Sequence, residues 1–233
     1  LLELPAQTQG FTVRQMASDV LCGPAYSNEL DVHVFDPFIP ATLEGEQLIC
    51  FGTAPAALSA VGPTGGGNDY HYEWYTMNAA DTILIAGENN ASIEMAELVE
   101  TTIYLLQPTS NYGCGSGWSN PLAIEVADSL VAGSFVVNPL GELRPADEVS
   151  AFGTNARGGI GPHEWNWWLG EGDSWQVVGS DLNLAPILLT DTAELTLVFS
   201  NSCGVVSSDT TTVIVNPLPP LSSIEGDLNP CVS

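Results

Sequence analysis

The chain of 233 residues has 28 acidic and 3 basic side chains, a formal net charge of −25, and its basic residues are all arginine. The lack of lysine excludes Schiff-base chemistry and a P-loop phosphate site, and the acidity disfavours nucleic acids and anionic membranes as partners. Because 45% of the residues are hydrophobic, the chain can bury cores and is expected to fold.

A cysteine segment occurs three times along the chain. The copies are Cys22-Gly-Pro-Ala-Tyr-Ser-Asn, Cys114-Gly-Ser-Gly-Trp-Ser-Asn and Cys203-Gly-Val-Val-Ser-Ser-Asp, which are 92 and then 89 residues apart. Eight residues after each cysteine an alternating run begins, at Leu30, Leu122 and Thr211. This alternation predicts a strand with one buried face after each copy.

A second set of matching segments lies upstream of the later cysteines. Residues 50–53 (Cys-Phe-Gly-Thr) match 151–154 (Ala-Phe-Gly-Thr), and residues 72–75 (Tyr-Glu-Trp-Tyr) match 165–168 (Trp-Asn-Trp-Trp). A glycine-rich turn separates the two segments in both copies. The matches predict that Trp74 and Trp167 are core residues on equivalent strands.

These repeats divide the chain into modules. Residues 39–128 and 129–219 are expected to be complete modules, the second lacking the first cysteine. We interpret residues 1–38 as the C-terminal part of an incomplete module and residues 220–233 as the first strand of a following one. Short strands and frequent turns predict an all-β fold of tandem immunoglobulin-like β-sandwich modules. Prolines near two of the junctions favour an elongated, semi-rigid rod.

Three tryptophans gather in the second module. We expect Trp167 in the core and Trp165 and Trp168 together on the opposite face of the strand, as a possible exposed aromatic contact. There they would pack against a neighbouring module or stack on a glycan.

No catalytic or metal-binding pattern is found. His33, His71 and His163 lack the spacing of metal ligands, so neither an enzyme nor a bound cofactor is expected. The junction residues Asp36, Asp128 and Asp227 are candidate calcium ligands, but no Asp-x-Asp-x-Asp-Gly loop accompanies them. A solvated anionic surface is the alternative interpretation.

The combination of Cys-x-Gly, a glycine-rich turn, Tyr-x-Trp, Thr-Thr-x-Tyr at 101–104, Cys-Gly and Ser-Asn resembles the tandem immunoglobulin-like or PKD-like repeats of giant Bacteroidota cell-surface proteins, including gliding-motility adhesins. In the immunoglobulin arrangement a tryptophan packs against a disulfide between the two sheets. The resemblance therefore implies a disulfide between Cys50 and Cys114. Cys203 is left as a lone thiol, either buried in the core or linked to another chain.

The resemblance also implies O-glycosylation. Four Asp-Ser or Asp-Thr pairs that are followed by an aliphatic residue or threonine resemble the short O-glycosylation signal of exported Bacteroidota proteins, and their acceptors are Thr82, Ser129, Thr192 and Thr210.

Together these features predict a structural segment, the stalk or fibre body of a secreted bacterial cell-surface adhesin or filament, without enzymatic activity. The expected partners are neighbouring modules, other copies in a fibre and surface glycans, with no nucleic acid and no membrane insertion. The alternatives are a carbohydrate-binding module of a cell-surface polysaccharide system and a filament subunit assembled by strand addition.

Overall fold

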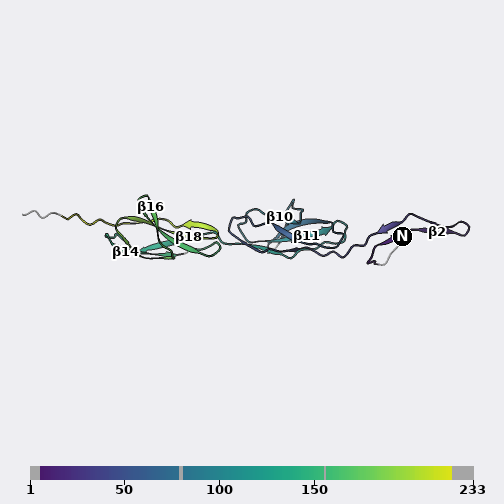
Figure 1. Cartoon of the computed structure of the whole chain (residues 1–233), viewed down its shortest axis with the longest axis horizontal. Helices are drawn as coiled ribbons and strands as arrows, with labels where there is room; N and C mark the ends of the chain where they lie inside the picture. Colours follow the sequence, from purple (N-terminus) through teal and green to yellow (C-terminus); the bar gives the residue numbers. More distant parts are fainter. Residues whose placement is uncertain (1–5, 79–80, 155, 222–233) are drawn as a thin grey trace, which may run out of the picture. The chain divides into compact units, whose positions relative to one another are not determined.

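The computed structural model describes residues 6–78, 81–154 and 156–221, and the regular elements in these ranges are all β-strands (Figure 1). The chain divides into two compact units, residues 1–126 and 127–233. The predicted all-β class is confirmed. The expected strand at residues 220–233, with Asp227, lies almost entirely outside the described residues.

The first unit contains a sandwich of a three-stranded and a five-stranded sheet. Their strand orders are β10–β7–β5 and β6–β12–β11–β8–β9. The bounds are β5 Thr42–Leu43, β6 Gln47–Ile49, β7 Leu58–Val61, β8 Tyr70–Met77, β9 Thr82–Leu84, β10 Ser92–Ile93, β11 Thr102–Ser110 and β12 Leu122–Val126. Strand β6 pairs in parallel with β12, whereas the other neighbours are antiparallel. This is an immunoglobulin-like arrangement.

The second unit repeats this topology. One sheet has the order β13–β14–β17, and the other has the order β16–β15–β18–β19 with β20 also paired to β18. The bounds are β13 Ser134–Asn138, β14 Asp147–Thr154, β15 Glu164–Glu171, β16 Ser174–Gly179, β17 Asn183–Leu189, β18 Ala193–Asn201, β19 Gly204–Ser207 and β20 Thr211–Val213. A parallel bridge between Leu143 and Val215 takes the place of the β6–β12 pairing.

The first unit also contains an interrupted hairpin near its N-terminus. Its strands are β1 Phe11–Val13, β2 Met16–Asp19, β3 Gly23–Tyr26 and β4 Leu30–Val32. Strand β1 pairs with β4, and β2 pairs with β3. The hairpin corresponds to β11–β12 and to β18–β19–β20, because in all three cases the repeated cysteine lies in the connecting turn.

Each sandwich core is organised around one tryptophan. Trp74 on β8 and Trp167 on β15 are both 0% exposed. Their indole N–H groups donate to the carbonyls of Asn90 (2.8 Å) and Asp181 (2.9 Å), so neither buried donor is left unpaired. The other buried core residues are Ala41, Leu43, Leu58, Ile93, Tyr104, Leu106, Leu122 and Ile124 around Trp74, and Val137, Leu143, Val149, Ala151, Leu169, Leu184, Leu189, Ala193, Leu195, Leu197, Val213 and Val215 around Trp167.

The disulfide expected between Cys50 and Cys114 is wrong. Cys114 is an exposed free thiol, as is Cys22, whereas Cys50 and Cys203 are disulfide-bonded. The interpretation of Cys203 as a lone thiol is therefore wrong as well. The reason is where the strands lie: Cys50 comes directly after β6, and Cys114 is in the turn beyond β11, so neither cysteine occupies the centre of the sandwich.

Leucines take the places that the immunoglobulin disulfide would have. Leu58 on β7 and Leu106 on β11 are 1% and 0% exposed and belong to the core around Trp74. Strand β7 lies between β5 and β10 as β14 lies between β13 and β17, so Ala151 on β14 corresponds to the β7 region and not to Cys50. The sandwich is held by apolar packing where an immunoglobulin domain has a covalent bond.

Alkylation of the native protein tests this cysteine assignment. We expect iodoacetamide to modify Cys22 and Cys114 without denaturant or reductant, because both thiols are free and exposed. Peptides containing Cys50 or Cys203 should stay unmodified until the protein is reduced. Peptide mass mapping provides the measurement, and alkylation of Cys50 in the unreduced protein would contradict the assignment.

Candidate functional site

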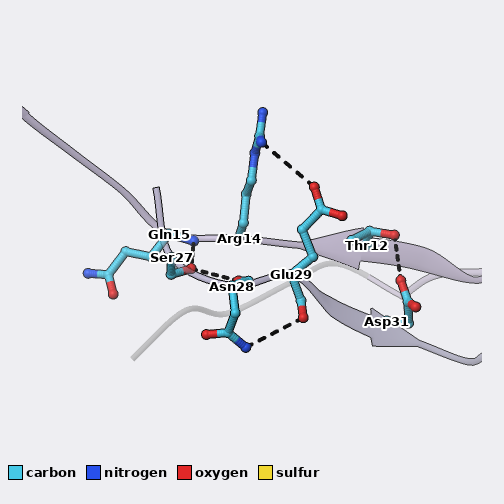
Figure 2. Close-up of polar contacts among 7 residues, drawn as sticks. All are labelled: Thr12, Arg14, Gln15, Ser27, Asn28, Glu29 and Asp31. Atoms are coloured by element: carbon cyan, nitrogen blue, oxygen red, sulfur yellow. Dashed lines mark hydrogen bonds and ion pairs between the residues drawn. The ribbon is translucent and has the colours of Figure 1, made fainter. Parts of the chain in front are cut away.

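The repeated serine closes the same hairpin three times. In each copy the serine Oγ accepts a hydrogen bond from a backbone N–H of the opposite strand and donates one to the carbonyl of the next residue (Figure 2 shows the first copy). The bonds join Ser27 to Gln15 and Asn28, Ser119 to Leu106 and Asn120, and Ser208 to Leu197 and Asp209, over 2.8–3.1 Å. The repeated Ser-Asn or Ser-Asp segment is thus a structural signature that fixes the hairpin register.

The N-terminal hairpin carries an arginine cluster on its surface. The Arg14 guanidinium lies 4.2 Å from the centre of the Tyr26 ring, and its Nη1 is 3.7 Å from Glu29 Oε1. Thr12 donates to Asp31 across the same strands, at 2.7 Å (Figure 2). One of the three cations of the chain is therefore held between an aromatic ring and a carboxylate.

The glycine-rich turn of each module binds the segment that leads into that module. The N–H of Gly66 donates to the carbonyl of Asp36, and the N–H of Gly159 donates to the carbonyl of Asp128, both at 2.8 Å. A neighbouring backbone bridge continues each contact, Ile39 with Thr64 and Val131 with Arg157. We call each such set of contacts a junction clamp.

In each module a side chain at the end of the hairpin's first strand also hydrogen-bonds to the glycine-rich turn. Ser110 Oγ donates to the Gly66 carbonyl (2.6 Å), and Asn201 Nδ2 donates to the Gly158 carbonyl (2.8 Å). Ser110 and Asn201 are equivalent, since each lies four residues beyond the leucine that is bonded to the repeated serine. The sequence predicted the glycine-rich segments only as turns. In the structure each of them connects the incoming segment to the hairpin of the same module.

Glycine is required at the first position of both clamps. Gly65 and Gly158 have φ values of +74° and +91°, and a Cβ at either position would overlap a backbone carbonyl, that of Pro37 or that of Ser129. Only glycine combines this backbone conformation with so close an approach.

An aromatic pair lies on the outer face of the five-stranded sheet of the first unit. The rings of Tyr75 and Trp118 meet nearly edge to face, with 4.9 Å between their centroids. The Tyr75 hydroxyl donates to Glu73 Oε2 (3.2 Å), and His71 Nε2 lies 4.0 Å from Glu73 Oε1. We call these four residues the aromatic platform. Sequence reasoning did not single out Trp118; the available signal was its place directly before the repeated serine.

The expected shared face of Trp165 and Trp168 is wrong. Residues two apart in a strand point to the same side, so Trp165 shares the inner face of β15 with Trp167. It packs against the core and lies 5.7 Å from Phe199 and 6.2 Å from His163, measured between ring centroids. Trp168 is on the outer face, where β15 places it opposite Thr196 and Val177.

Trp165 also borders a shallow pocket of about 360 Å³. His163, Glu164, Asn166, Ser180 and Asp181 complete its lining. The indole nitrogen of Trp165 is buried and has no hydrogen-bond partner among the described residues. Because this N–H group is buried, a ligand in the pocket could not accept a hydrogen bond from it.

The remaining predicted residues lie apart from one another. The four glycan acceptors are exposed, but the Thr192 hydroxyl is bonded to the Val215 backbone at 3.0 and 3.4 Å. Asp36 and Asp128 contribute carbonyls to the junction clamps. Within the described ranges no three His, Cys, Asp or Glu side chains gather as for a metal ion, and no helix is long and apolar enough to cross a membrane.

A family model described as a domain of unknown function (DUF8696) matches residues 39–128. No curated protein matches the chain. Among solved structures, the chain is similar to the three N-terminal domains of the highly immunogenic outer capsid protein (Hoc) of bacteriophage RB49. The identity is 11% and the TM-score 0.42, over 94% of this chain and 92% of that one.

Two further similar structures are modular proteins. The fibronectin(III)-like modules of CbhA from Clostridium thermocellum match at 12% identity and a TM-score of 0.33, over 79% of this chain and 100% of that one. The FN1–FN3 domains of chicken CNTN1 match at 12% identity and a TM-score of 0.37, over 88% and 75% of the two chains. At these identities the likeness concerns the fold alone. The strand topology by itself defines the class of the two units, tandem immunoglobulin-like β-sandwich modules.

Alanine substitutions test the junction clamps. Gly65→Ala and Gly158→Ala should each lower the free energy of unfolding by at least about 1 kcal/mol more than their controls, because the added Cβ overlaps the incoming backbone. The controls are Gly87→Ala and Gly141→Ala, which have φ values of +93° and +119° but open space around the Cβ, and should cost about 1–2 kcal/mol. Denaturant unfolding followed by tryptophan fluorescence gives the values; equal losses in test and control variants would rule out the clamp.

Proposed function

We propose that this segment is the structural body of a stalk or fibre in a secreted bacterial cell-surface adhesin or filament, without enzymatic activity. The observation that carries the proposal is the junction clamp, which both units build from the same backbone hydrogen bonds. A module that binds its own incoming segment limits the freedom of the junction, and a spacer needs this property.

The strand pairing suits a chain under tension. In the first unit β6 lies near the start of the sandwich and β12 at its end, and the two pair in parallel from Gln47 opposite Ile124 to Ile49 opposite Val126. A pull on the two ends of the module loads this row of hydrogen bonds together, in shear, rather than opening them one at a time. The Leu143–Val215 bridge has the same orientation in the second unit.

The composition supports display outside the cell. A net charge of −25 keeps repeated modules soluble and mutually repelling, and disulfide-bonded cysteines persist in oxidising surroundings. The proposed origin in Bacteroidota rests on the repeat motifs and the Asp-Ser and Asp-Thr pairs. We extend the proposal to O-glycans on Thr82, Ser129 and Thr210, and expect little on Thr192 because its hydroxyl is already bonded to the backbone.

Single-molecule force measurements test the spacer function. Proline at Leu48 removes a backbone donor from β6, so Leu48→Pro should lower the unfolding force of the first unit. The control Leu84→Pro lies on β9, at the opposite edge of the same sheet and away from the β6–β12 pair, and should leave the force closer to that of the unmodified protein. If both variants lowered the force equally, the parallel pair would not bear the load.

Labelling of the native producer tests the location and the glycans. Antibodies to the segment should bind intact cells and lose their target after brief treatment with external protease. Peptide masses of the released protein should show glycans on Thr82, Ser129 and Thr210. Labelling only after lysis would contradict surface display, whereas unmodified peptides at all three positions would contradict glycosylation alone.

A further inference from the structure

The aromatic platform presents two rings and a carboxylate to solvent. Alternate residues of β8 face outward, which places His71, Glu73 and Tyr75 on the side opposite the buried Trp74. Trp118 joins them from the segment that leads into β12 and is 47% exposed, while the Glu73 side chain is 37% exposed. The rings and the carboxylate are thus accessible from the same side of the sheet.

The platform is held in place before any ligand arrives. Leu105, directly opposite Tyr75 on β11, is 9% exposed although it points to the outer face, so the surrounding side chains pack closely over it. Burial, followed by the negative charge of Glu73, raises the pKa of the Tyr75 hydroxyl. The hydroxyl therefore keeps its proton at neutral pH and donates to Glu73. Little side-chain freedom remains to be lost on binding.

The N-terminal hairpin contains an aromatic ring that already contacts a cation. Tyr26 directly precedes Ser27, as Trp118 directly precedes Ser119, so the two rings occupy equivalent positions. Over the Tyr26 ring lies the guanidinium of Arg14, which is also paired with a carboxylate, that of Glu29 (Figure 2 shows the ion pair).

The equivalent of Arg14 in the first sandwich is Leu105, because each directly precedes the residue bonded to the repeated serine. The platform therefore has the equivalent ring and an apolar residue in place of the cation, and its carboxylate, Glu73, comes from a different strand, β8, because Pro121 takes the place of Glu29. In the second unit the residue before Ser208 is Ser207, so that unit lacks the ring at this position.

Charge selects the class of ligand. The protein has a formal net charge of −25, and the Glu73 carboxylate lies beside the rings of Tyr75 and Trp118. The platform therefore disfavours anionic ligands and attracts cationic ones. Guanidinium groups are planar, weakly hydrated and able to stack on an aromatic face while donating to a carboxylate. From this we infer that the aromatic platform binds an exposed arginine side chain of a partner protein, with the guanidinium on the Tyr75–Trp118 rings and Glu73 as its counter-charge.

Titration with a short peptide tests the inference. The probe is acetyl-Gly-Gly-Arg-Gly-Gly-amide, added to ¹⁵N-labelled protein while the indole N–H resonances are followed by NMR. We expect the Trp118 resonance to shift and saturate. The peptide with citrulline, which keeps the shape but is neutral, should bind at least about threefold more weakly, because the cation–π and ion-pair attractions are lost.

Matched variants separate the site from general attraction to an acidic protein. Trp118→Ala and Glu73→Gln should each weaken binding about three- to tenfold, measured for every variant from the backbone amide resonances of β8, because Trp118→Ala removes the indole signal. Trp175→Ala removes a ring that is 42% exposed on β16, and Glu97→Gln removes one exposed charge elsewhere in the first unit; both should leave the affinity unchanged. Unshifted Trp74 and Trp167 resonances verify that each variant is folded.

Three outcomes would overturn the inference. Equal binding of the citrulline and arginine peptides would remove the role of the cation. An equal loss in the control variants would show attraction to the whole charge of the protein rather than to the platform. A shift of Trp118 with cellohexaose but not with the arginine peptide would make the platform a saccharide site.

Discussion

The indole of one buried tryptophan fixes how each sandwich closes. Trp74 fills the centre of the core and donates to the Asn90 carbonyl, in the loop where the chain crosses from one sheet to the other. Trp167 does the same with Asp181. This bond and the surrounding aliphatic side chains secure the two sheets together, so no covalent link is needed at Leu58 and Leu106. Cysteines are thereby free to occupy strand ends and hairpin turns.

The features that could be predicted from the sequence are those with a local signal. Period-two alternation after each repeated cysteine marked the last strand of each hairpin, and the Tyr-x-Trp segment marked the buried tryptophan strand. The disulfide could not be predicted in this way. The order of Cys50, Trp74 and Cys114 matches an immunoglobulin domain, but the pairing depends on which strand each cysteine joins. The short strands β6 and β7 are close together in the sequence. Cys50 follows β6 and does not lie on β7, the strand that would place it in the core.

The candidate sites depended on contacts between distant segments. The junction clamps join Asp36 to Gly66 and Asp128 to Gly159, and nothing in the glycine runs themselves identifies the acceptor. The aromatic platform joins β8 to a segment more than forty residues later, through Tyr75 and Trp118. In contrast, the position of Trp165 was open to sequence reasoning, because its spacing from Trp167 already places both residues on one face of the strand.

The serine bonds of the hairpins bear on how such an array folds. Each bond spans only 11 to 13 residues, from Ser208 to Leu197, from Ser27 to Gln15 and from Ser119 to Leu106. Contacts this close in sequence form on the microsecond timescale, well before the pairing of distant strands. We expect each hairpin to be present early as a nucleus with its register already set. Similar neighbouring modules would otherwise exchange strands during folding, which is the characteristic error of tandem repeats. A nucleus that selects its partner from its own module lowers the rate of that exchange.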